Sequence, residues 1–268
     1  MERRDRRYLA ALATVGVLGI ASAPAVMGQA QGGQPAPAPE RTLVTTTHVK
    51  PEMVPAYQEL IQKEVVPAFK KAGLPFRWVF ANGPVGPGAT FVSVQPIQKY
   101  ADFDQGPMLR AAMGDAYDKY LARVRPMVVS THGVIQTLVQ NASLRSFSGK
   151  PPVWVTVTTV NLQQGRGPEF ASITAEEYLP AYKKAGVADY WVFAANFGAP
   201  GTTRTIVTPI SGWADLDQPS PLTRALGQEA AQKLGQKRGA LTTGAQTVVM
   251  RYVPELSFGV PARPAGSK

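Results

Sequence analysis

Two stretches of the chain show the same order of apolar and polar positions. Each begins with a run rich in β-branched residues, 42–49 or 153–162, which predicts a strand. In the first stretch, apolar residues then recur at helical spacing over residues 52–72 and a glycine follows, which predicts a helix. Pro67 and its counterpart Pro180 fall within these helices, so we expect each proline to kink its helix or to start a second short segment.

The rest of each stretch predicts a hairpin, a second helix and a last strand. Gly- and Pro-rich turns separate two short apolar runs, which is typical of a β-hairpin. The elements that we expect are hairpin strands at 76–81 with 90–96 and at 189–194 with 203–209, helices at 107–125 and 220–239, and last strands at 133–140 and 244–252. The order strand, helix, strand, strand, helix, strand is that of the ferredoxin-like split βαβ unit.

The two stretches are copies of one another. Residues 66–81 read VPAFKKAGLPFRWVFA and residues 179–194 read LPAYKKAGVADYWVFA, and a separation of 113 residues aligns 42–114 with the second copy without a gap. Beyond the second helix the alignment shifts, and it pairs Thr131, Gly133 and Ser146 with Thr242, Gly244 and Ser257. The chain therefore contains an internal duplication.

The duplication has a physical reason. A ferredoxin-like sheet covers one face with its two helices and leaves the other face bare, and two such sheets can bury their bare faces against each other. The sequence therefore predicts an α+β fold, with two tandem ferredoxin-like (βαββαβ) units packing sheet to sheet as an intrachain dimeric α/β barrel.

The residues also carry a resemblance to a known superfamily. The unit order, the segment P-A-[FY]-K-K-A-G-x(4)-W-V-F-A and the later P-I-x(3)-A-D-x-D resemble the dimeric α/β-barrel proteins, in particular NIPSNAP-like and antibiotic-biosynthesis-monooxygenase-like members. The likeness covers residues 42–258 and includes no diagnostic catalytic signature. That superfamily includes cofactor-independent oxygenases, haem-degrading enzymes, haem-dependent chlorite dismutases, isomerases and proteins without known activity, so the resemblance narrows the function only slightly.

The beginning of the chain has a different composition. In residues 1–30, four arginines precede an uncharged apolar run, which is typical of an export signal peptide, and the Gly/Pro/Ala/Gln-rich residues 31–40 predict a flexible linker. We therefore expect an exported protein, periplasmic or extracellular, whose mature form has no transmembrane segment. The signal is either a general one or a twin-arginine one. The remaining predicted boundaries are a first unit at 41–147, a linker at 148–152, a second unit at 153–258 and a disordered tail at 259–268.

Composition excludes several kinds of site. The chain has no cysteine, and therefore no disulfide, thiolate nucleophile or cysteine-based metal site. Its net charge is +10, but lysine and arginine are dispersed and no nucleic-acid motif appears, so we expect no nucleic-acid partner. Phosphate-loop and nucleophile-elbow motifs are absent as well. Whether the protein is a monomer or a higher oligomer stays open.

An aromatic wall is predicted on the second strand of each unit. Alternation places Trp78, Phe80 and Asn82 on one face of the strand, and Trp191 repeats the tryptophan in the second unit. If this face lines the space between the sheets, it suits a planar apolar ligand. The resemblance to cofactor-independent oxygenases implies that Trp78 and Asn82 hold an aromatic substrate. The alternative is that these aromatic side chains form the core between the sheets.

Polar differences between the copies give further candidates. Arg204 stands where the first unit has Phe91, and Tyr190 stands where it has Arg77. Arg204 with Tyr190 or Asn196 could position an anionic group of a ligand.

His48 and His132 are the only histidines. Either could be a haem ligand or a general base, and His48 joins Trp78 and Asn82 as a catalytic candidate. Because a metal site normally draws on several His, Cys or carboxylate groups, we expect no metal site, and the alternative for each imidazole is an ordinary hydrogen-bonded histidine.

Three functions follow from these observations. The first is an exported protein that binds or oxidises a small aromatic or lipophilic molecule in the inter-sheet space without a metal or other cofactor, as a cofactor-independent monooxygenase would. The second is a non-catalytic interaction or structural protein. The third is a haem-binding protein that uses His48 or His132.

Overall fold

Strand pairing closes the two copies of the repeat into one barrel. The computed structural model describes residues 40–104, 106–146 and 150–261. Within these residues the strand order is β2 (Phe76–Asn82), β3 (Thr90–Ile97), β1 (Arg41–Val49), β4 (Val128–Leu138), β7 (Asp189–Phe197), β8 (Thr203–Ile210), β6 (Trp154–Leu162) and β9 (Thr242–Tyr252). All neighbours are antiparallel, and β9 pairs with β2 to close the ring. The predicted α+β class and dimeric α/β-barrel fold are confirmed.

Several predicted segments lie outside the described residues. These are the signal peptide at 1–30, the linker as far as residue 39, residues 147–149 of the unit boundary and the tail from residue 262. The described residues all belong to one compact unit.

The first half of the barrel contains four long strands, two interrupted helices and a last, two-residue strand. Its elements are β1 (Arg41–Val49), η1 (Pro51–Met53), α1 (Val54–Leu60), η2 (Ile61–Val65), α2 (Val66–Lys71), β2 (Phe76–Asn82), β3 (Thr90–Ile97), η3 (Tyr100–Phe103), α3 (Met108–Met113), α4 (Ala116–Val124), η4 (Arg125–Met127), β4 (Val128–Leu138), η5 (Gln140–Ala142) and β5 (Leu144–Arg145).

The second half repeats this order. Its elements are β6 (Trp154–Leu162), α5 (Gly167–Ile173), η6 (Thr174–Tyr178), α6 (Leu179–Lys184), β7 (Asp189–Phe197), β8 (Thr203–Ile210), η7 (Trp213–Asp217), α7 (Pro221–Leu226), α8 (Gln228–Gly239), β9 (Thr242–Tyr252), η8 (Pro254–Leu256) and β10 (Phe258–Gly259).

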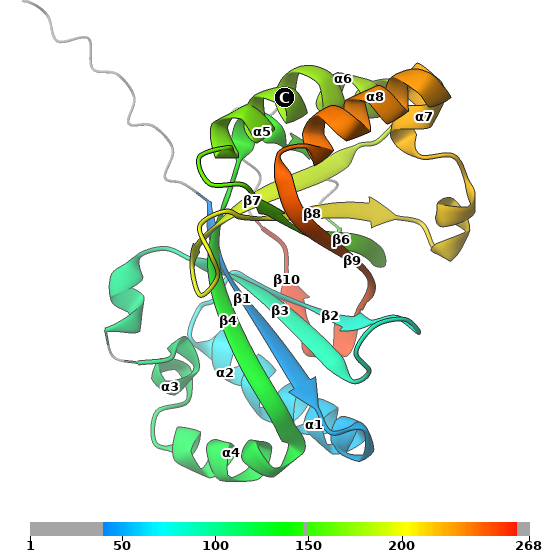
Figure 1. Cartoon of the computed structure of the whole chain (residues 1–268). Helices are drawn as coiled ribbons and strands as arrows, with labels where there is room; N and C mark the ends of the chain where they lie inside the picture. The colour runs from blue at the N-terminus through cyan, green and yellow to red at the C-terminus, as the bar shows by residue number, and fades with distance from the viewer. Residues whose placement is uncertain (1–39, 105, 147–149, 262–268) are drawn as a thin grey trace, which may run out of the picture. The chain divides into compact units, whose positions relative to one another are not determined.

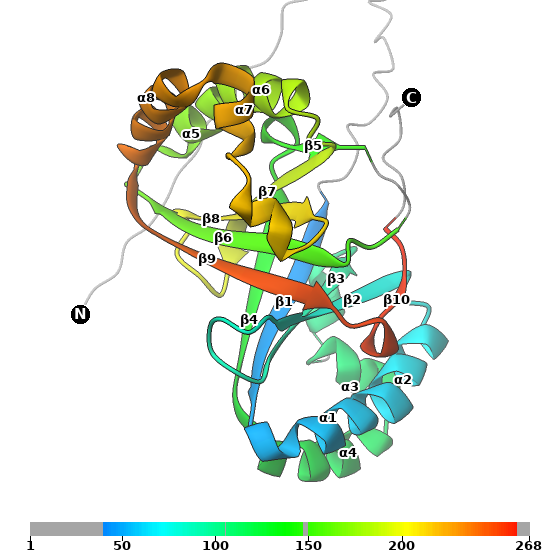
Figure 2. The ribbon, with the colours of Figure 1, turned by 90° about the vertical axis from the view of Figure 1, so that its right-hand side faces the viewer.

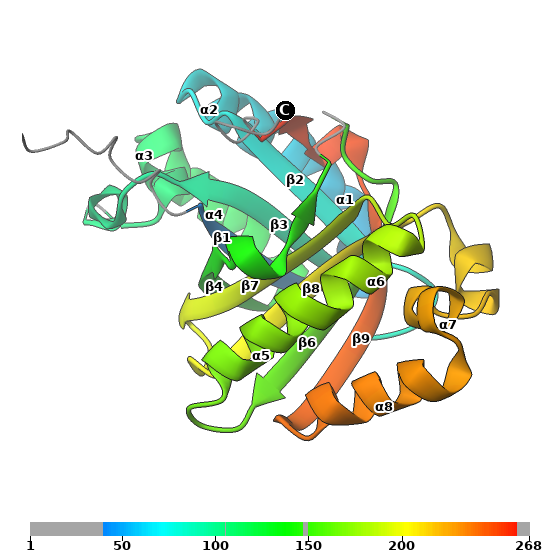
Figure 3. The same cartoon turned by 90° about the horizontal axis from the view of Figure 1, so that it is seen from above.

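The helices of the two halves cover opposite sides of the strands. Helices α1–α4 lie against the strands of the first half and α5–α8 against those of the second half (Figures 1 and 2). From above, α5, α6 and α8 lie over the strands of the second half (Figure 3). Each barrel strand therefore has one face toward helices and one toward the barrel interior.

Alternating side chains fill these two environments. The barrel interior holds a buried cluster of Phe76, Trp78, Phe80, Val155 and Met250. Two separate clusters lie between helices and strands, one in each half. The tryptophan face of β2 thus forms packed core inside the barrel, where rings of Trp78 and Trp191 have centroids 6.4 Å apart.

Each proline inside the first helix of a unit follows a π-helical turn through which the backbone stays helical. Pro67 lies in the first turn of α2, directly after the π-helical turn η2, and Pro180 lies in the first turn of α6, directly after the π-helical turn η6. A proline ring collides with the carbonyl four residues earlier in an α-helix, and the wider π turn removes that conflict.

The second helix of each unit is not continuous, and the prediction of single helices at 107–125 and 220–239 was wrong. Gly114 separates α3 from α4 with a φ of 55°, and Gly227 separates α7 from α8 with a φ of 82°. Residues with a side chain rarely adopt these backbone angles, so the two aligned glycines specify the break.

The last strands follow a register that the sequence alignment missed. His132 lies opposite Thr46 and Gln246 lies opposite Thr159, so the separation between equivalent residues becomes 114 in β4 and β9. The predicted pairing of Thr131 and Gly133 with Thr242 and Gly244 was therefore wrong. One extra residue between the helix break and the last strand of the second half accounts for the change.

Each half is completed by a segment from the other half. We call residues 139–145 and 253–259 the exchanged arms. In the first arm, Val139 N donates to Val192 O (2.7 Å), Val192 N donates to Ser143 Oγ (3.0 Å), and β5 pairs with β7. The second arm mirrors these bonds on the first half, through Val253 N to Val79 O (2.8 Å), Val79 N to Ser257 Oγ (2.9 Å), and pairing of β10 with β2. Ser143, and not Ser146, is therefore the counterpart of Ser257.

Candidate functional site

A cavity lies between the helices and the sheet in each half. The second-half cavity has a volume of about 1140 Å³ and the first-half cavity about 590 Å³. Many lining residues are repeat partners, among them Tyr57 with Phe170, Val65 with Tyr178, Phe69 with Tyr182, Thr45 with Thr158 and Gln95 with Thr208. The cavity is thus a property of the repeated unit, and both volumes suit small-molecule ligands.

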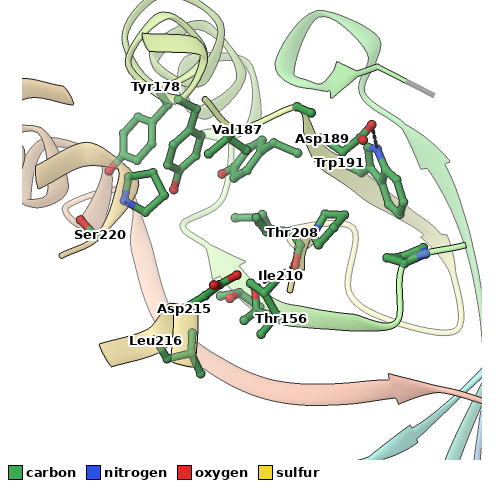
Figure 4. Close-up of a pocket in the computed structure, with 18 of the residues that line it drawn as sticks. Thr156, Tyr178, Val187, Asp189, Trp191, Thr208, Ile210, Asp215, Leu216 and Ser220 are labelled. Atoms are coloured by element: carbon green, nitrogen blue, oxygen red, sulfur yellow. Dashed lines mark hydrogen bonds between the residues drawn. The ribbon is translucent and has the colours of Figure 1, made fainter. Parts of the chain in front are cut away.

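Aromatic rings form the helix side of the second-half cavity. Phe170, Tyr178 and Tyr182 lie on α5, η6 and α6 at intervals of eight and four residues, which places them on one face of the helix. Thr156 and Thr208 line the sheet side from β6 and β8. Figure 4 shows Tyr178 on one side of the opening and Thr156 with Asp215 on the other.

One arginine connects the tyrosines of this wall. The Arg238 guanidinium lies 3.5 Å from the centroid of the Tyr178 ring, and its Nη1 donates to the Tyr190 hydroxyl at 2.8 Å. The Tyr182 and Tyr190 rings have centroids 4.7 Å apart. Burial raises the pKa of Tyr178, Tyr182 and Tyr190, so these phenols are neutral and present a polar edge on an apolar wall.

The remainder of this wall carries both signs of charge. Asp189, Asp215, Arg224 and Lys150 also line the cavity. Asp189 accepts hydrogen bonds from Ser146 N (3.0 Å), Ser146 Oγ (2.7 Å) and Trp191 Nε1 (3.3 Å), and Asp215 accepts one from Ser211 N (2.7 Å). Both carboxylates therefore already accept hydrogen bonds from nearby backbone N–H groups.

The first-half cavity has a different electrostatic character. Its described lining includes two arginines, Arg77 and Arg125, and no carboxylate. Arg77 is 6% exposed, and its Nη1 donates to Leu256 O at 2.8 Å. Its Nε has no hydrogen-bond partner among the described residues. Burial lowers the pKa of Arg77, and the neighbouring hydroxyls of Tyr57 and Tyr120 act in the opposite direction.

The predicted ligand-binding residues of the two hairpins do not lie together. Tyr190 and Trp191 line the second-half cavity, and so does Trp78, whose indole also belongs to the barrel-interior cluster and donates to Gly259 O at 3.0 Å. Asn82 lies elsewhere, because its Nδ2 donates to Pro87 O at 2.7 Å within its own hairpin.

Asn196 and Arg204 line neither cavity. Asn196 Oδ1 accepts a hydrogen bond from Thr137 Oγ1 at 2.7 Å where β4 meets β7. Arg204 Nη1 donates to the carbonyls of Gly201 and Thr203, both at 2.9 Å. The structure does not bring Arg204 together with Tyr190 and Asn196 around one space.

Neither histidine lines either of these two cavities. His48 Nδ1 lies 2.8 Å from Thr90 Oγ1, and His132 is an exposed residue of β4. Within the described part of the chain, no group of three or more His, Asp or Glu side chains could hold a metal ion. The imidazoles offer no axial ligand to a haem in either cavity, so the residues present do not fit that group there.

Sequence reasoning missed most of the residues that form the two walls. Phe170, Tyr178 and Tyr182 carried a usable signal, since they follow one helical face, but apolar residues at this spacing ordinarily indicate core. Arg77 carried another signal, because alternation places it on the same face of β2 as Val79, which is 2% exposed.

No helix among the described residues is long and apolar enough to span a membrane. No family model matches the sequence, and no curated protein matches it.

Solved structures with the same fold are distant in sequence. An anthrone oxidase-like protein superposes with a TM-score of 0.57 at 12% identity, covering 85% of this chain and 97% of its own. A proposed monooxygenase from Fusobacterium nucleatum has a TM-score of 0.55 at 9% identity, with 81% and 94% covered. A mutant chlorite dismutase from Candidatus Nitrospira defluvii has a TM-score of 0.52 at 10% identity, with 80% and 92% covered. At these identities the likeness establishes the fold alone.

Proposed function

We propose that this protein binds a small aromatic or lipophilic molecule in the helix–sheet cavity of its second half. The observation that carries the proposal is a volume of about 1140 Å³ whose helix side includes the rings of Phe170, Tyr178 and Tyr182. A wall of this kind buries a planar apolar ligand by stacking, and the neutral phenol groups can orient its polar substituents. The inter-sheet space is occupied by the barrel-interior cluster, so we place the ligand on the helix side.

Binding is better supported than turnover. Oxidation without a metal needs a proton acceptor beside the substrate. The carboxylates in this wall, Asp189 and Asp215, already accept hydrogen bonds from the local backbone. The names of the structural neighbours, a proposed monooxygenase and an anthrone oxidase-like protein, motivate a separate measurement of oxygen uptake with anthrone. A rate above the protein-free control would add an oxidase activity to the binding function.

The binding proposal is tested with a neutral fluorescent probe, N-phenylnaphthylamine. We expect its emission to rise on mixing with the full chain and to rise less with Thr208→Trp, because an indole at this β8 position takes up space in the cavity beside the aromatic rings. The matched control is Gln95→Trp, which places the same side chain at the equivalent position of the first half. Equal probe binding by Thr208→Trp and the wild type, with both folded, would reject the proposal.

We also propose that the protein acts after export. Support comes from the arginine-led apolar run in residues 1–30. Fractionation of cells that express the full chain should recover a shortened protein outside the cytoplasm. A change of Arg6 and Arg7 to lysine should block this only if the twin-arginine route is used.

A further inference from the structure

We infer that the first-half cavity is a second, separate binding site, which takes a small apolar carboxylate and holds its anionic group at Arg77. This site differs from the one proposed above in position and in ligand charge, and it does not depend on that proposal.

The first argument is the unbalanced charge. A buried guanidinium is normally paired with a carboxylate, because an isolated charge in a low-dielectric interior is costly. Arg77 is 6% exposed and has no acidic partner within ion-pair distance among the described residues. Among the described residues its guanidinium donates to the carbonyl of Leu256, and its Nε has no partner.

The second argument is the space beside that charge. Arg77 lines a cavity of about 590 Å³, and the described lining holds no aspartate or glutamate that could compete with an incoming anion. A guanidinium recognises a carboxylate with paired N–H donors, and an unused Nε is one of the five donors that it offers. The hydroxyls of Tyr57 and Tyr120 lie close enough to influence Arg77, and they can donate to the same anion.

The third argument is the nature of the other walls. Ile61, Phe69, Phe91 and Leu121 line the cavity, together with further apolar side chains, so the body of the ligand is apolar. Arg125 also lines it and is exposed, which places a second positive charge where an anion can meet the protein.

The competing explanation is that Arg77 is purely structural. Its bond to Leu256 O fastens the second exchanged arm to β2, beside the bond from Val79 N to Ser257 Oγ. The experiment must therefore separate loss of the arm from loss of the cation. Ser257→Ala weakens the same arm and leaves the guanidinium in place, so it is the matched control.

The test compares naphthoate with its neutral analogue naphthylmethanol by isothermal titration calorimetry on the full chain. The starting protein is Thr208→Trp, in which an indole obstructs the second-half cavity, so that the heat comes mainly from the first-half cavity. We expect naphthoate to bind at least about tenfold more tightly than the alcohol, as expected for charge-assisted hydrogen bonds. Arg77→Gln should abolish this preference, Arg77→Lys should keep part of it, and Ser257→Ala should keep it whole.

A further variant covers the case in which Arg77→Gln does not fold. Gln95→Trp places an indole in the same cavity and keeps Arg77, and it should weaken naphthoate binding. The inference is overturned if the folded starting protein does not bind naphthoate, if Gln95→Trp binds it unchanged, or if Ser257→Ala loses the preference as completely as Arg77→Gln. None of these outcomes affects the N-phenylnaphthylamine result, so the two proposals fail independently.

Discussion

The equivalent cavities of the two halves receive their arginine from different elements. In the first half the strand supplies the arginine, Arg77, and in the second half the equivalent strand position is Tyr190. The second half supplies its arginine from α8, where Arg238 rests on a tyrosine ring and bonds a phenol oxygen. A duplicated cavity can therefore keep its position in the fold while the position of its arginine changes, and we expect that position to determine which ligand binds.

The largest expected difference between the halves concerns the size of one wall residue. Tyr178 and Val65 are equivalent and both are 2% exposed. Tyr178→Ala should lower the free energy of unfolding by about 3 kcal/mol or more, because it removes a large ring that Arg238 also contacts. Val65→Ala removes two methyl groups and should cost about 2 kcal/mol. Urea unfolding of both variants measures the gap, and equal costs would show that the second-half wall is no more tightly packed than the first.

The next effect concerns the exchanged arms, which should contribute equally to the two halves. Ser143→Ala strips Val192 N of its acceptor and Ser257→Ala does the same to Val79 N, so each should cost about 1 to 3 kcal/mol. The sites are separate, so the double variant should be close to additive in urea unfolding. The control is Ser146→Ala, an exposed serine bonded to Asp189, for which we expect a change below about 0.5 kcal/mol.

A smaller effect is expected at the two helix breaks. Gly114→Ala and Gly227→Ala place a side chain at a positive φ, although no atom lies within 4 Å of the added carbon in either half. Backbone strain alone should lower the free energy of unfolding by about 1 to 2 kcal/mol. Thermal unfolding of each variant measures this cost, and an unchanged midpoint would mean that the break can move along the helix.

The smallest effect at neutral pH comes from the buried phenols. Burial raises the pKa of Tyr57 and Tyr120 in the first half and of Tyr182 and Tyr190 in the second. The folded protein then keeps phenol protons that the unfolded chain releases above about pH 10, so stability is intact below that pH and falls as the pH rises further. Tyr120→Phe and Tyr182→Phe should each flatten this alkaline loss. Urea unfolding measured between neutral pH and pH values above about 10 gives the slope, and an unchanged slope in both variants would contradict the assignment.

The repeat made the fold predictable, and the same repeat concealed the sites. Matching segments such as 66–81 and 179–194 fixed the unit, its element order and the barrel. The cavities could not be foreseen, because Phe170, Tyr178 and Tyr182 have the spacing of an ordinary core face. The exchanged arms were equally hidden, since a two-residue strand such as β5 or β10 has no periodicity and its partner lies in the other copy.

The exchanged arms also determine when folding can finish. Trp78 Nε1 donates to the carbonyl of Gly259, a contact between residues 181 positions apart in the chain. During synthesis the first copy therefore emerges long before the second exchanged arm that completes it. Until that arm is made, β2 lacks its partner β10. Contacts of such long sequence separation slow folding. We expect the first copy to stay incomplete until the last strand arrives.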